Sequence, residues 1–313
     1  MSAVIPPRVV LGQTIGIVAP AGPVKLDKLR TGLARLGDAF DLRLAPSITE
    51  ARAPGLPSYL AASDEVRAAE LMAMLADPDV RAILLARGGY GLMRILPLLD
   101  PEVLRRDPKP IVGFSDATAL LSWAHAAGVR GIHGPMGVQM ASLPESDIAQ
   151  TIAMLTDARP LGVRPWPLAS AEHAHVQGTL FAANLTLVSM LVATPWALPL
   201  RGSITLLEDV GEKPYELDRY LTHLTLTGEL AKPGAVIVGD LTRCTDPNPA
   251  TGVPDPEGAA LATVLERLRA AGTPAATGAP IGHGDRNEPV PFGAAAVLDL
   301  TYRYFEILEP AVA

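Results

Sequence analysis

The feature that most constrains the fold is a regular alternation of strand and helix patterns in the first part of the chain. Short apolar runs typical of β-strands alternate with stretches whose apolar residues recur at helical spacing, over residues 14–19, 26–36, 40–44, 64–76, 81–86, 92–99 and 110–114. This order predicts a parallel sheet covered by helices on both faces. Ligands bind such sheets at the carboxyl ends of the strands, so we expect functional residues directly after these runs.

The alternation of strand and helix patterns becomes weak after residue 135. A Pro-rich stretch at residues 160–167 predicts an interdomain connection. A second segment begins near Gly178 and mixes both patterns, with β-type runs at 204–207, 235–238, 294–298 and 304–308 and helical stretches at 185–192, 215–224 and 258–270. We therefore predict an α/β protein. Residues 1–160 form a parallel-sheet N-terminal domain, and residues 170–313 form a smaller C-terminal mixed α/β domain with its own β structure.

Composition excludes several classes of partner. The net charge of −7 and an aromatic content of only 4% argue against nucleic acid, whose binding calls for an excess of Lys and Arg and for stacking side chains. The single cysteine, Cys244, excludes an intramolecular disulfide and a metal site built from several cysteines. We expect no nucleic-acid partner.

The chain carries no pattern that would direct it to a membrane. Its N-terminus lacks a basic segment followed by an apolar core of signal-peptide length, and no apolar run reaches the roughly 18 residues of a membrane span. We therefore expect a cytoplasmic protein without a membrane partner.

Ser115 stands at the corner between an apolar run and a helical stretch. The run at residues 111–114 ends at this serine, and residues 117–127 continue as a helix. A serine at such a corner is pushed out of the sheet and lies beside the N–H groups that open the helix, as a nucleophile requires. Ser115 or Asp116 could equally cap that helix. Both readings stay open on the spacing alone.

A serine nucleophile needs a base, and the chain offers six histidines. His283 lies between Gly282 and Gly284 in a loop, where backbone freedom lets an imidazole project into a site, and we favour it. His133, near a strand end, is the alternative. The other histidines fall in helical or polar connecting stretches and are typical of surface or core positions: His125, His173, His175 and His223.

The base needs an orienting acid, and the oxyanion of acyl transfer needs backbone donors. Glu208 and Asp209 follow a buried type of strand, where they either orient the base or form a solvated strand end or helix cap. Gly88 and Gly89, together with the N–H of Asp116, would supply oxyanion donors. The loop 87–91 lacks the glycine spacing of nucleotide-binding loops, so it gives little support to a nucleotide site.

Taken together, these stretches resemble the LD-carboxypeptidases, a serine peptidase family that includes muramoyl-tetrapeptide carboxypeptidases and microcin C immunity peptidases. The resemblance spans nearly the whole chain. It rests on five stretches in order: Ile-Gly-Ile-Val-Ala-Pro-Ala-Gly at 15–22, Ala-Arg-Gly-Gly-Tyr-Gly at 86–91, Gly-Phe-Ser-Asp-Ala-Thr-Ala at 113–119, Leu-Leu-Glu-Asp-Val at 206–210 through Asp-Arg at 218–219, and Gly-His at 282–283. Each stretch alone is weak, but their order is specific.

The resemblance implies a catalytic triad and a small set of neighbours. The triad residues are Ser115, Glu208 and His283, and the oxyanion hole is formed by backbone at Gly88 or Gly89 and at Asp116. Members of the family are usually homodimers and need neither metal nor cofactor. A carboxypeptidase must also bind a terminal carboxylate, for which Arg87 is the nearest cation in sequence, unless it is simply a surface arginine.

The family's substrate is a cell-wall peptide that ends in D-alanine, cut after an L-configured centre. The resemblance therefore implies release of D-alanine from cytoplasmic muropeptides in peptidoglycan recycling. The alternative is a self-immunity amidase acting on a microcin C-type peptidyl-nucleotide, whose aromatic base calls for a stacking side chain. The loop 245–256 contains no aromatic residue, which favours the first reading. A third reading is a non-catalytic sugar- or nucleotide-binding module in which Ser115 and His283 are incidental.

Overall fold

The computed structural model describes residues 3–313, which form two compact units. Unit 1 contains the described residues up to Pro160 together with Asn287–Gly293 and Pro310–Ala313, and unit 2 contains Leu161–Arg286 and Ala294–Glu309. The two short segments depart from the C-terminal domain predicted over residues 170–313. The physical reason is strand pairing in unit 1, where β11 (Val290–Phe292) lies antiparallel to β5 (Gly131–His133).

The sheet of unit 1 follows from the strand and helix alternation. Its strand order is β11-β5-β4-β3-β1-β2, and every neighbouring pair except β11 with β5 is parallel. The remaining strands are β1 (Thr14–Val18), β2 (Asp41–Leu44), β3 (Val80–Leu85) and β4 (Ile111–Gly113). Ile17, Ile83 and Val112 are fully buried, so the central strands are apolar on both faces, as parallel strands between helical layers must be.

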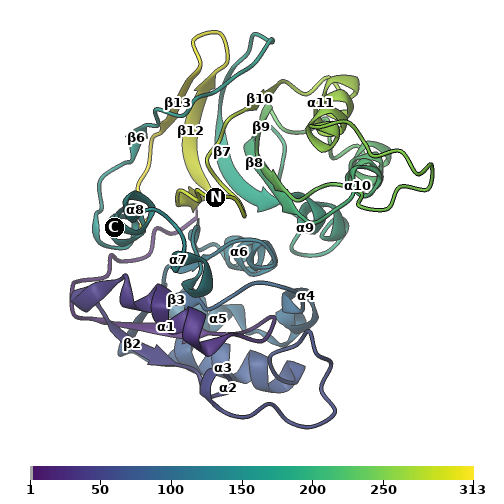
Figure 1. Ribbon diagram of the computed structural model, residues 1–313. Helices are drawn as coiled ribbons and strands as arrows, with labels where there is room; N and C mark the ends of the chain where they lie inside the picture. The colour runs from purple at the N-terminus through teal and green to yellow at the C-terminus, as the bar shows by residue number, and fades with distance from the viewer. Residues whose placement is uncertain (1–2) are drawn as a thin grey trace. The chain divides into compact units, whose positions relative to one another are not determined.

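Helices connect these strands and lie against the sheet (Figure 1). They are α1 (Leu26–Ala34), α2 (Pro46–Thr49), α3 (Asp64–Ala76), α4 (Leu92–Ile95), α5 (Pro101–Arg106), α6 (Ala117–Ala126), α7 (Gly137–Met140) and α8 (Glu145–Thr156), with short 3₁₀ turns at Gly37–Ala39 and Leu96–Leu98. Ser63 begins α3 by accepting a hydrogen bond from the backbone N–H of Val66. Leu71 and Leu75 of the same helix are fully buried.

Unit 2 contains a mixed sheet with a parallel half and an antiparallel half. Its order is β10-β9-β8-β7-β12-β13-β6. The strands are β6 (Gly162–Val163), β7 (His175–Asn184), β8 (Ile204–Val210), β9 (Ala235–Thr242), β10 (Ala275–Thr277), β12 (Ala294–Asp299) and β13 (Tyr304–Ile307). Strands β7 to β10 are parallel, and β12, β13 and β6 continue the sheet antiparallel from β7. The predicted fold class, with a mostly parallel N-terminal sheet and a mixed C-terminal one, is confirmed.

The parallel half of this sheet brings four carboxyl ends to one edge. Helices α9 (Leu185–Met190), α10 (Pro214–Leu226) and α11 (Ala259–Ala270) connect its strands, and Figure 1 shows them along one side of β8 and β9. Because consecutive strands run in the same direction, the residues that end β7, β8 and β9 meet the loop that follows β10. That loop carries His283.

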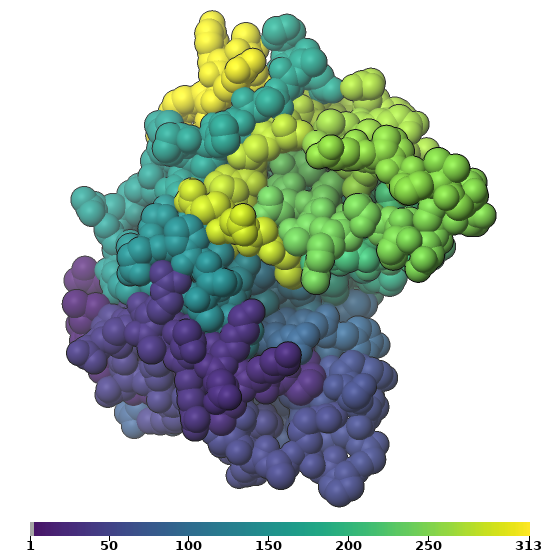
Figure 2. Space-filling model, viewed as in Figure 1, coloured from purple at the N-terminus to yellow at the C-terminus, as the bar shows by residue number. Residues whose placement is uncertain are grey.

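Two segments differ from their sequence-based description. Strand β7 has ten residues, although its first half reads as a polar connection, because the alternate residues between His175 and Thr179 face solvent. The helix predicted over residues 92–99 is α4 followed by a 3₁₀ turn that contains Pro97. The loop 245–256 is mostly exposed, as expected, and lies within the green surface of unit 2 in Figure 2.

No helix within residues 3–313 is both long enough and apolar enough to cross a membrane.

Candidate active site

Ser115 occupies a strained turn in unit 1. Strand β4 ends at Gly113 and α6 begins at Ala117, so the chain reverses from strand to helix within three residues. Ser115 adopts a φ of 61°, a left-handed conformation that a residue with a side chain rarely takes. Strain of this kind persists only where the surrounding structure enforces it, and it concentrates at functional positions. In other hydrolase folds, a sharp strand-to-helix turn of this kind presents a serine hydroxyl at the sheet edge.

The glycine loop after β3 lies directly against this serine. A Cβ atom built on Gly88 would stand 3.3 Å from Ser115 Oγ, a tight contact, so the absence of a side chain lets the backbone approach the hydroxyl closely. Gly89 has a φ of +116°, which favours glycine for a separate reason. Across residues 3–313, the backbone N–H groups of Gly88, Gly89 and Asp116 donate to no other group of the protein. These donors are the predicted oxyanion donors.

Arg87 lies beside the same loop. Its side chain is exposed, and Nη1 donates a 2.8 Å hydrogen bond to the carbonyl of Pro23. Its Nη2 is 4.0 Å from the position that a Cβ on Gly89 would occupy. The guanidinium is thus held at the glycine loop with N–H groups to spare for an anion.

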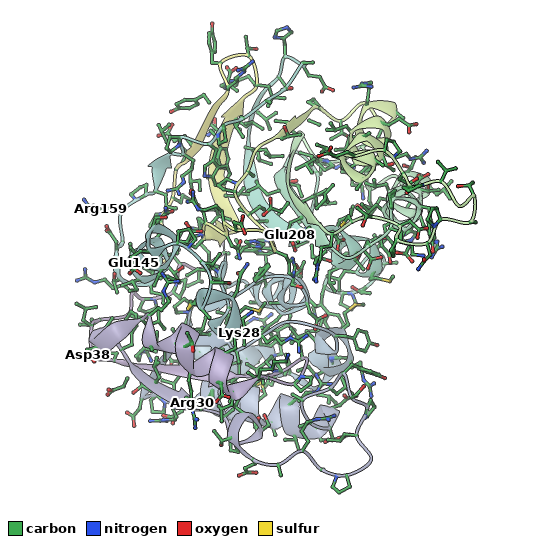
Figure 3. The ribbon with its side chains drawn as sticks, in the orientation of Figure 1. Lys28, Arg30, Asp38, Glu145, Arg159 and Glu208 are labelled. Carbon is green, nitrogen blue, oxygen red and sulfur yellow. The ribbon has the colours of Figure 1, made fainter. Side chains whose placement is uncertain are left out.

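In unit 2, Glu208 and His283 form a buried carboxylate–imidazole pair. Glu208 ends the apolar part of β8, is completely buried, and is labelled in Figure 3. Its Oε2 lies 2.6 Å from His283 Nδ1, and its Oε1 accepts a 3.3 Å hydrogen bond from Asn184 Nδ2. Burial raises the pKa of Glu208, and the hydrogen bond and charge of His283 oppose that rise.

This pairing defines the chemistry of the imidazole. When the carboxylate accepts the proton on His283 Nδ1, the lone pair resides on Nε2, which is the nitrogen that a general base uses. The His283 side chain is 21% exposed, whereas Glu208 is not exposed at all. The carboxylate is therefore buried behind an imidazole that is partly exposed.

The two glycines that flank His283 are required by close packing. Gly282 has a φ of +125°, and a Cβ on it would lie 3.1 Å from Glu208 Cβ. A Cβ on Gly284 would lie 2.2 Å from Asp240 Oδ2, which instead accepts a 3.1 Å hydrogen bond from the Gly284 backbone. Asp240, near the carboxyl end of β9, thus anchors the loop that presents the imidazole.

Asp209 has a different role from its neighbour. Its carboxylate accepts hydrogen bonds from the backbone and hydroxyl of Thr186, at 2.9 and 2.8 Å, and from Asn184 Nδ2 at 3.0 Å. Asn184 also caps α9 through the N–H of Leu187. Asp209 therefore anchors the start of α9, and Asn184 joins both carboxylates.

Asn184 was not among the residues singled out from the sequence. Its signal is the pattern of an Asn that follows an apolar run and precedes a helical stretch, which predicts a helix cap. Its contact with Glu208 depends on the parallel register of β7 and β8, which pairs these two residues.

The other histidines lie in surroundings different from that of His283. His133 is fully buried in β5, with its ring edge-on to Phe114 at 5.8 Å between centroids. His223 Nδ1 lies 2.9 Å from the hydroxyl of Ser189. His125 is half-buried in α6, and burial lowers its pKa. His173 and His175 are exposed.

Within residues 3–313, no group of three or more His, Cys, Asp or Glu residues is arranged to hold a metal ion. Cys244 is buried, and burial raises the pKa of its thiol to about 12. A hydroxyl at a strained turn and an imidazole paired with a carboxylate are the residue types that serine hydrolases use.

Both parts of the chain match models of one known protein family. Residues 15–134 match the LD-carboxypeptidase N-terminal domain of peptidase family S66, and residues 177–298 match the C-terminal domain of the same family. A protein of Streptomyces coelicolor is 34% identical over 98% of this chain and 97% of its own. The murein tetrapeptide carboxypeptidase of Pseudomonas aeruginosa is 33% identical over 91% of this chain and 92% of its own.

Solved structures show the same fold. A muramoyltetrapeptide carboxypeptidase from Oxalobacter formigenes has a TM-score of 0.78 at 26% identity, covering 95% of this chain and all of that one. The microcin C7 self-immunity protein MccF has a TM-score of 0.84 at 21% identity, covering 99% of both chains. On the matches to both domains and to full-length relatives, the chain belongs to the LD-carboxypeptidase family of serine peptidases, peptidase family S66.

Proposed function

We propose that this hydrolase is a serine LD-carboxypeptidase that removes the C-terminal D-alanine from murein tetrapeptides, leaving tripeptides. The observation that carries the proposal is the buried Glu208–His283 pair, because it supplies a base with its orienting acid, which a serine peptidase requires. The relative from Pseudomonas aeruginosa that is named a murein tetrapeptide carboxypeptidase supports the choice of substrate.

In the proposed reaction, Ser115 is the nucleophile and His283 the general base. His283 Nε2 takes the proton from Ser115 Oγ as the oxygen attacks the carbonyl carbon of the residue before D-alanine. The tetrahedral intermediate collapses when the same imidazole returns the proton to the amine of D-alanine, which leaves. A water molecule activated by His283 then attacks the acyl ester and restores the serine. Glu208 holds the imidazole in the required tautomer throughout.

The proposed oxyanion donors are the N–H groups of Gly88 or Gly89 and of Asp116. Gly88 lies against the Ser115 hydroxyl, and Gly89 and Asp116 directly follow Gly88 and Ser115 in the chain. The three N–H groups donate to no other group within residues 3–313. Removal of one such donor typically lowers kcat by about 10²- to 10³-fold. We assign Arg87 to the terminal carboxylate of the substrate, because its guanidinium lies exposed at the same loop.

We place the reaction in the cytoplasm, within peptidoglycan recycling, and assign it to a homodimer. These assignments rest on the family resemblance. Light scattering on the purified protein measures its oligomeric state directly, and a monomer would contradict the homodimer.

The test is a substrate assay with a matched pair of peptides. The purified protein should release D-alanine from a muramyl tetrapeptide and leave the D-alanyl-D-alanine terminus of a pentapeptide intact. Ser115→Ala should abolish release, and unchanged release would refute the nucleophile. His283→Ala should also abolish release, and loss in His133→Ala with full activity in His283→Ala would reverse the choice of base.

A second substrate tests the alternative function. A peptidyl-sulfamoyl adenosine offered in the same assay should be cleaved poorly, because the loop 245–256 contains no aromatic residue to stack on the base. Efficient cleavage of this compound, with no release of D-alanine from the tetrapeptide, would favour a self-immunity amidase.

A further inference from the structure

A buried arginine lies beneath the loops at the carboxyl edge of the unit 1 sheet. Arg67, in the first turn of α3, is only 1% exposed. Its guanidinium donates to the carbonyls of Pro20, of Gly91 (3.0 Å) and of Ala62 (3.2 Å), and also to the carboxylate of Asp64. A buried cation is stable only when its donors are satisfied in this way.

The carbonyls that Arg67 holds belong to the loops around the nucleophile. Pro20 follows β1, and Gly91 ends the glycine loop after β3. A hydrogen bond of 3.2 Å from the N–H of Gly22 to the carbonyl of Gly88 joins the same two loops. A Cβ on Gly91 would lie 2.9 Å from Arg67 Nη1, so this glycine makes room for the guanidinium. Arg67 thus fixes the glycine loop from below.

The carboxylate of Asp116 holds the other side of this loop. Asp116 is 3% exposed, and its Oδ2 accepts a 3.0 Å hydrogen bond from the backbone N–H of Leu92. Leu92 follows Gly91 directly, and Asp116 follows Ser115 directly. Contacts therefore run from Arg67 through Gly91 and Leu92 to Asp116 and the nucleophile turn.

Burial of the Asp116 carboxylate costs free energy, so its position calls for a physical explanation. Burial raises the pKa of Asp116 to about 6, even though the Leu92 N–H and the positive charge of Arg67 both lower it. A neutral side chain would avoid this desolvation penalty. A carboxylate is, however, a strong hydrogen-bond acceptor, and through the N–H of Leu92 it joins the glycine loop to Asp116, which follows Ser115.

We propose that the side chains of Arg67 and Asp116 are positioning residues for the reaction. They set the distance between the glycine loop, which carries the proposed oxyanion donor at Gly88 or Gly89, and the Ser115 turn, which carries the nucleophile. This proposal rests on the assignment of Ser115 as the nucleophile. It gives the Asp116 side chain a role separate from that of its backbone N–H.

The kinetic test compares variants that remove or keep the acceptor. Displacement of catalytic groups by about 1 Å lowers the rate by roughly 10²-fold. Asp116→Ala should therefore lower kcat for D-alanine release roughly 10²-fold and leave KM within about twofold, because the Arg87 guanidinium is held separately by the carbonyl of Pro23. Asp116→Asn keeps an acceptor oxygen and should stay within about tenfold of the wild-type kcat.

Arg67 gives a second pair of variants. Arg67→Lys places a shorter cation under the same carbonyls and should retain more kcat than Arg67→Met, which leaves those carbonyls without their donor. The control is Asp100→Ala, which also removes a carboxylate that accepts a backbone N–H in unit 1, here from Glu102 at the start of α5. Its kcat should equal that of the wild type. Circular dichroism confirms that each variant is folded.

Two readouts do not depend on the substrate. Hydrogen exchange at the Leu92 amide should accelerate in Asp116→Ala and not in Asp100→Ala. A fluorophosphonate, which phosphonylates an activated serine, should label Ser115 more slowly in Asp116→Ala than in the wild type. If the wild type fails to release D-alanine, the proposed function is wrong, and these two readouts still decide the positioning role.

Three results would overturn the proposal. The first is a kcat of folded Asp116→Ala within about threefold of the wild type. The second is equal loss in Asp116→Asn and Asp116→Ala, which would show that the accepted N–H is irrelevant. The third is unchanged Leu92 exchange together with unchanged serine labelling in Asp116→Ala.

Discussion

Replacement of Glu208 by glutamine removes the negative charge but keeps the shape of the side chain. The variant therefore measures what the charge contributes to catalysis. In the wild type, Oε2 faces His283 Nδ1 at 2.6 Å and Oε1 faces Asn184 Nδ2 at 3.3 Å. An amide has only one oxygen to offer these two positions. When the amide oxygen faces His283, its NH₂ group faces the NH₂ group of Asn184. When the amide is flipped, its NH₂ group faces His283 and Asn184 keeps its acceptor.

The structure determines which orientation is favoured. The productive orientation leaves two buried donors opposed, which costs about 1–3 kcal/mol, whereas the flipped orientation satisfies every group if His283 carries its proton on Nε2. A histidine in that tautomer cannot accept the serine proton. The penalty alone lowers the productive population by roughly 5- to 150-fold, and loss of the charge that stabilises the imidazolium adds to it. A total loss in kcat on the order of 10⁴ follows, as in other triads that lose their acid charge.

The same substitution should leave the fold as stable as before at neutral pH. The pKa of Glu208 is raised in the folded protein, so its contribution to stability is fully present below its ordinary pKa and is lost as the pH rises through the raised value. Glutamine does not titrate. The free energy of unfolding of Glu208→Gln relative to the wild type should therefore increase from acidic to neutral pH.

The assay is D-alanine release coupled to D-amino-acid oxidase, with thermal unfolding measured on the same samples. Glu172→Gln is the matched control, because Glu172 lies in unit 2 and its carboxylate accepts the N–H of Ala275, at the opposite end of the parallel strands. Its kcat should be unchanged. A kcat of Glu208→Gln within tenfold of the wild type would refute the tautomer argument, and a lower melting temperature at neutral pH would refute the stability argument.

Three further predictions test the local geometry. Ser115→Gly should be more stable than Ser115→Ala by about 1 kcal/mol in urea unfolding, because glycine accepts the left-handed backbone, and equal stability would argue against strain at the turn. Gly284→Ala should lower kcat sharply, since its Cβ would meet Asp240 Oδ2 at 2.2 Å, and Asp240→Ala in the same chain should restore part of the loss; an additive double variant would contradict the steric cause. Gly88→Ala should reduce kcat with little change in stability, whereas Gly89→Ala should reduce both, because only Gly89 has a positive φ; the reverse pattern in kinetics and thermal unfolding would contradict this.

The sequence was most informative for candidate site residues that lie shortly after the end of a strand. Gly88 and Ser115 come within three residues of the ends of β3 and β4, which the apolar runs do form, so local pattern alone placed them near the sheet edge. The fold class and the family could be predicted for the same reason. The roles of the site residues remain proposals.

Relations between distant segments could not be read from local pattern. The contact of Asn184 with Glu208 depends on the register of β7 and β8, and β7 itself was hidden because its first half is polar. The carboxylate of Asp116 reaches a backbone N–H that lies 24 residues earlier in the chain. The close fit of Gly284 on Asp240 likewise depends on tertiary packing, which amino-acid spacing does not encode.

The return of β11 and of Pro310–Ala313 to unit 1 has a consequence for how the protein is made. During synthesis, unit 2 can pair its strands from β7 to β10 before the ribosome reaches Val290, whereas β5 must wait for β11 as its outer neighbour. The backbone N–H of Arg8 gains its acceptor later still, because it donates to the carbonyl of Ala313. The segment around Arg8 is therefore translated before β1 and completed only after Ala313, and until β11 is made β5 is an open edge that invites pairing with other chains. A fragment ending at Pro160 would keep that edge permanently, so cutting the chain once cannot yield two self-sufficient halves.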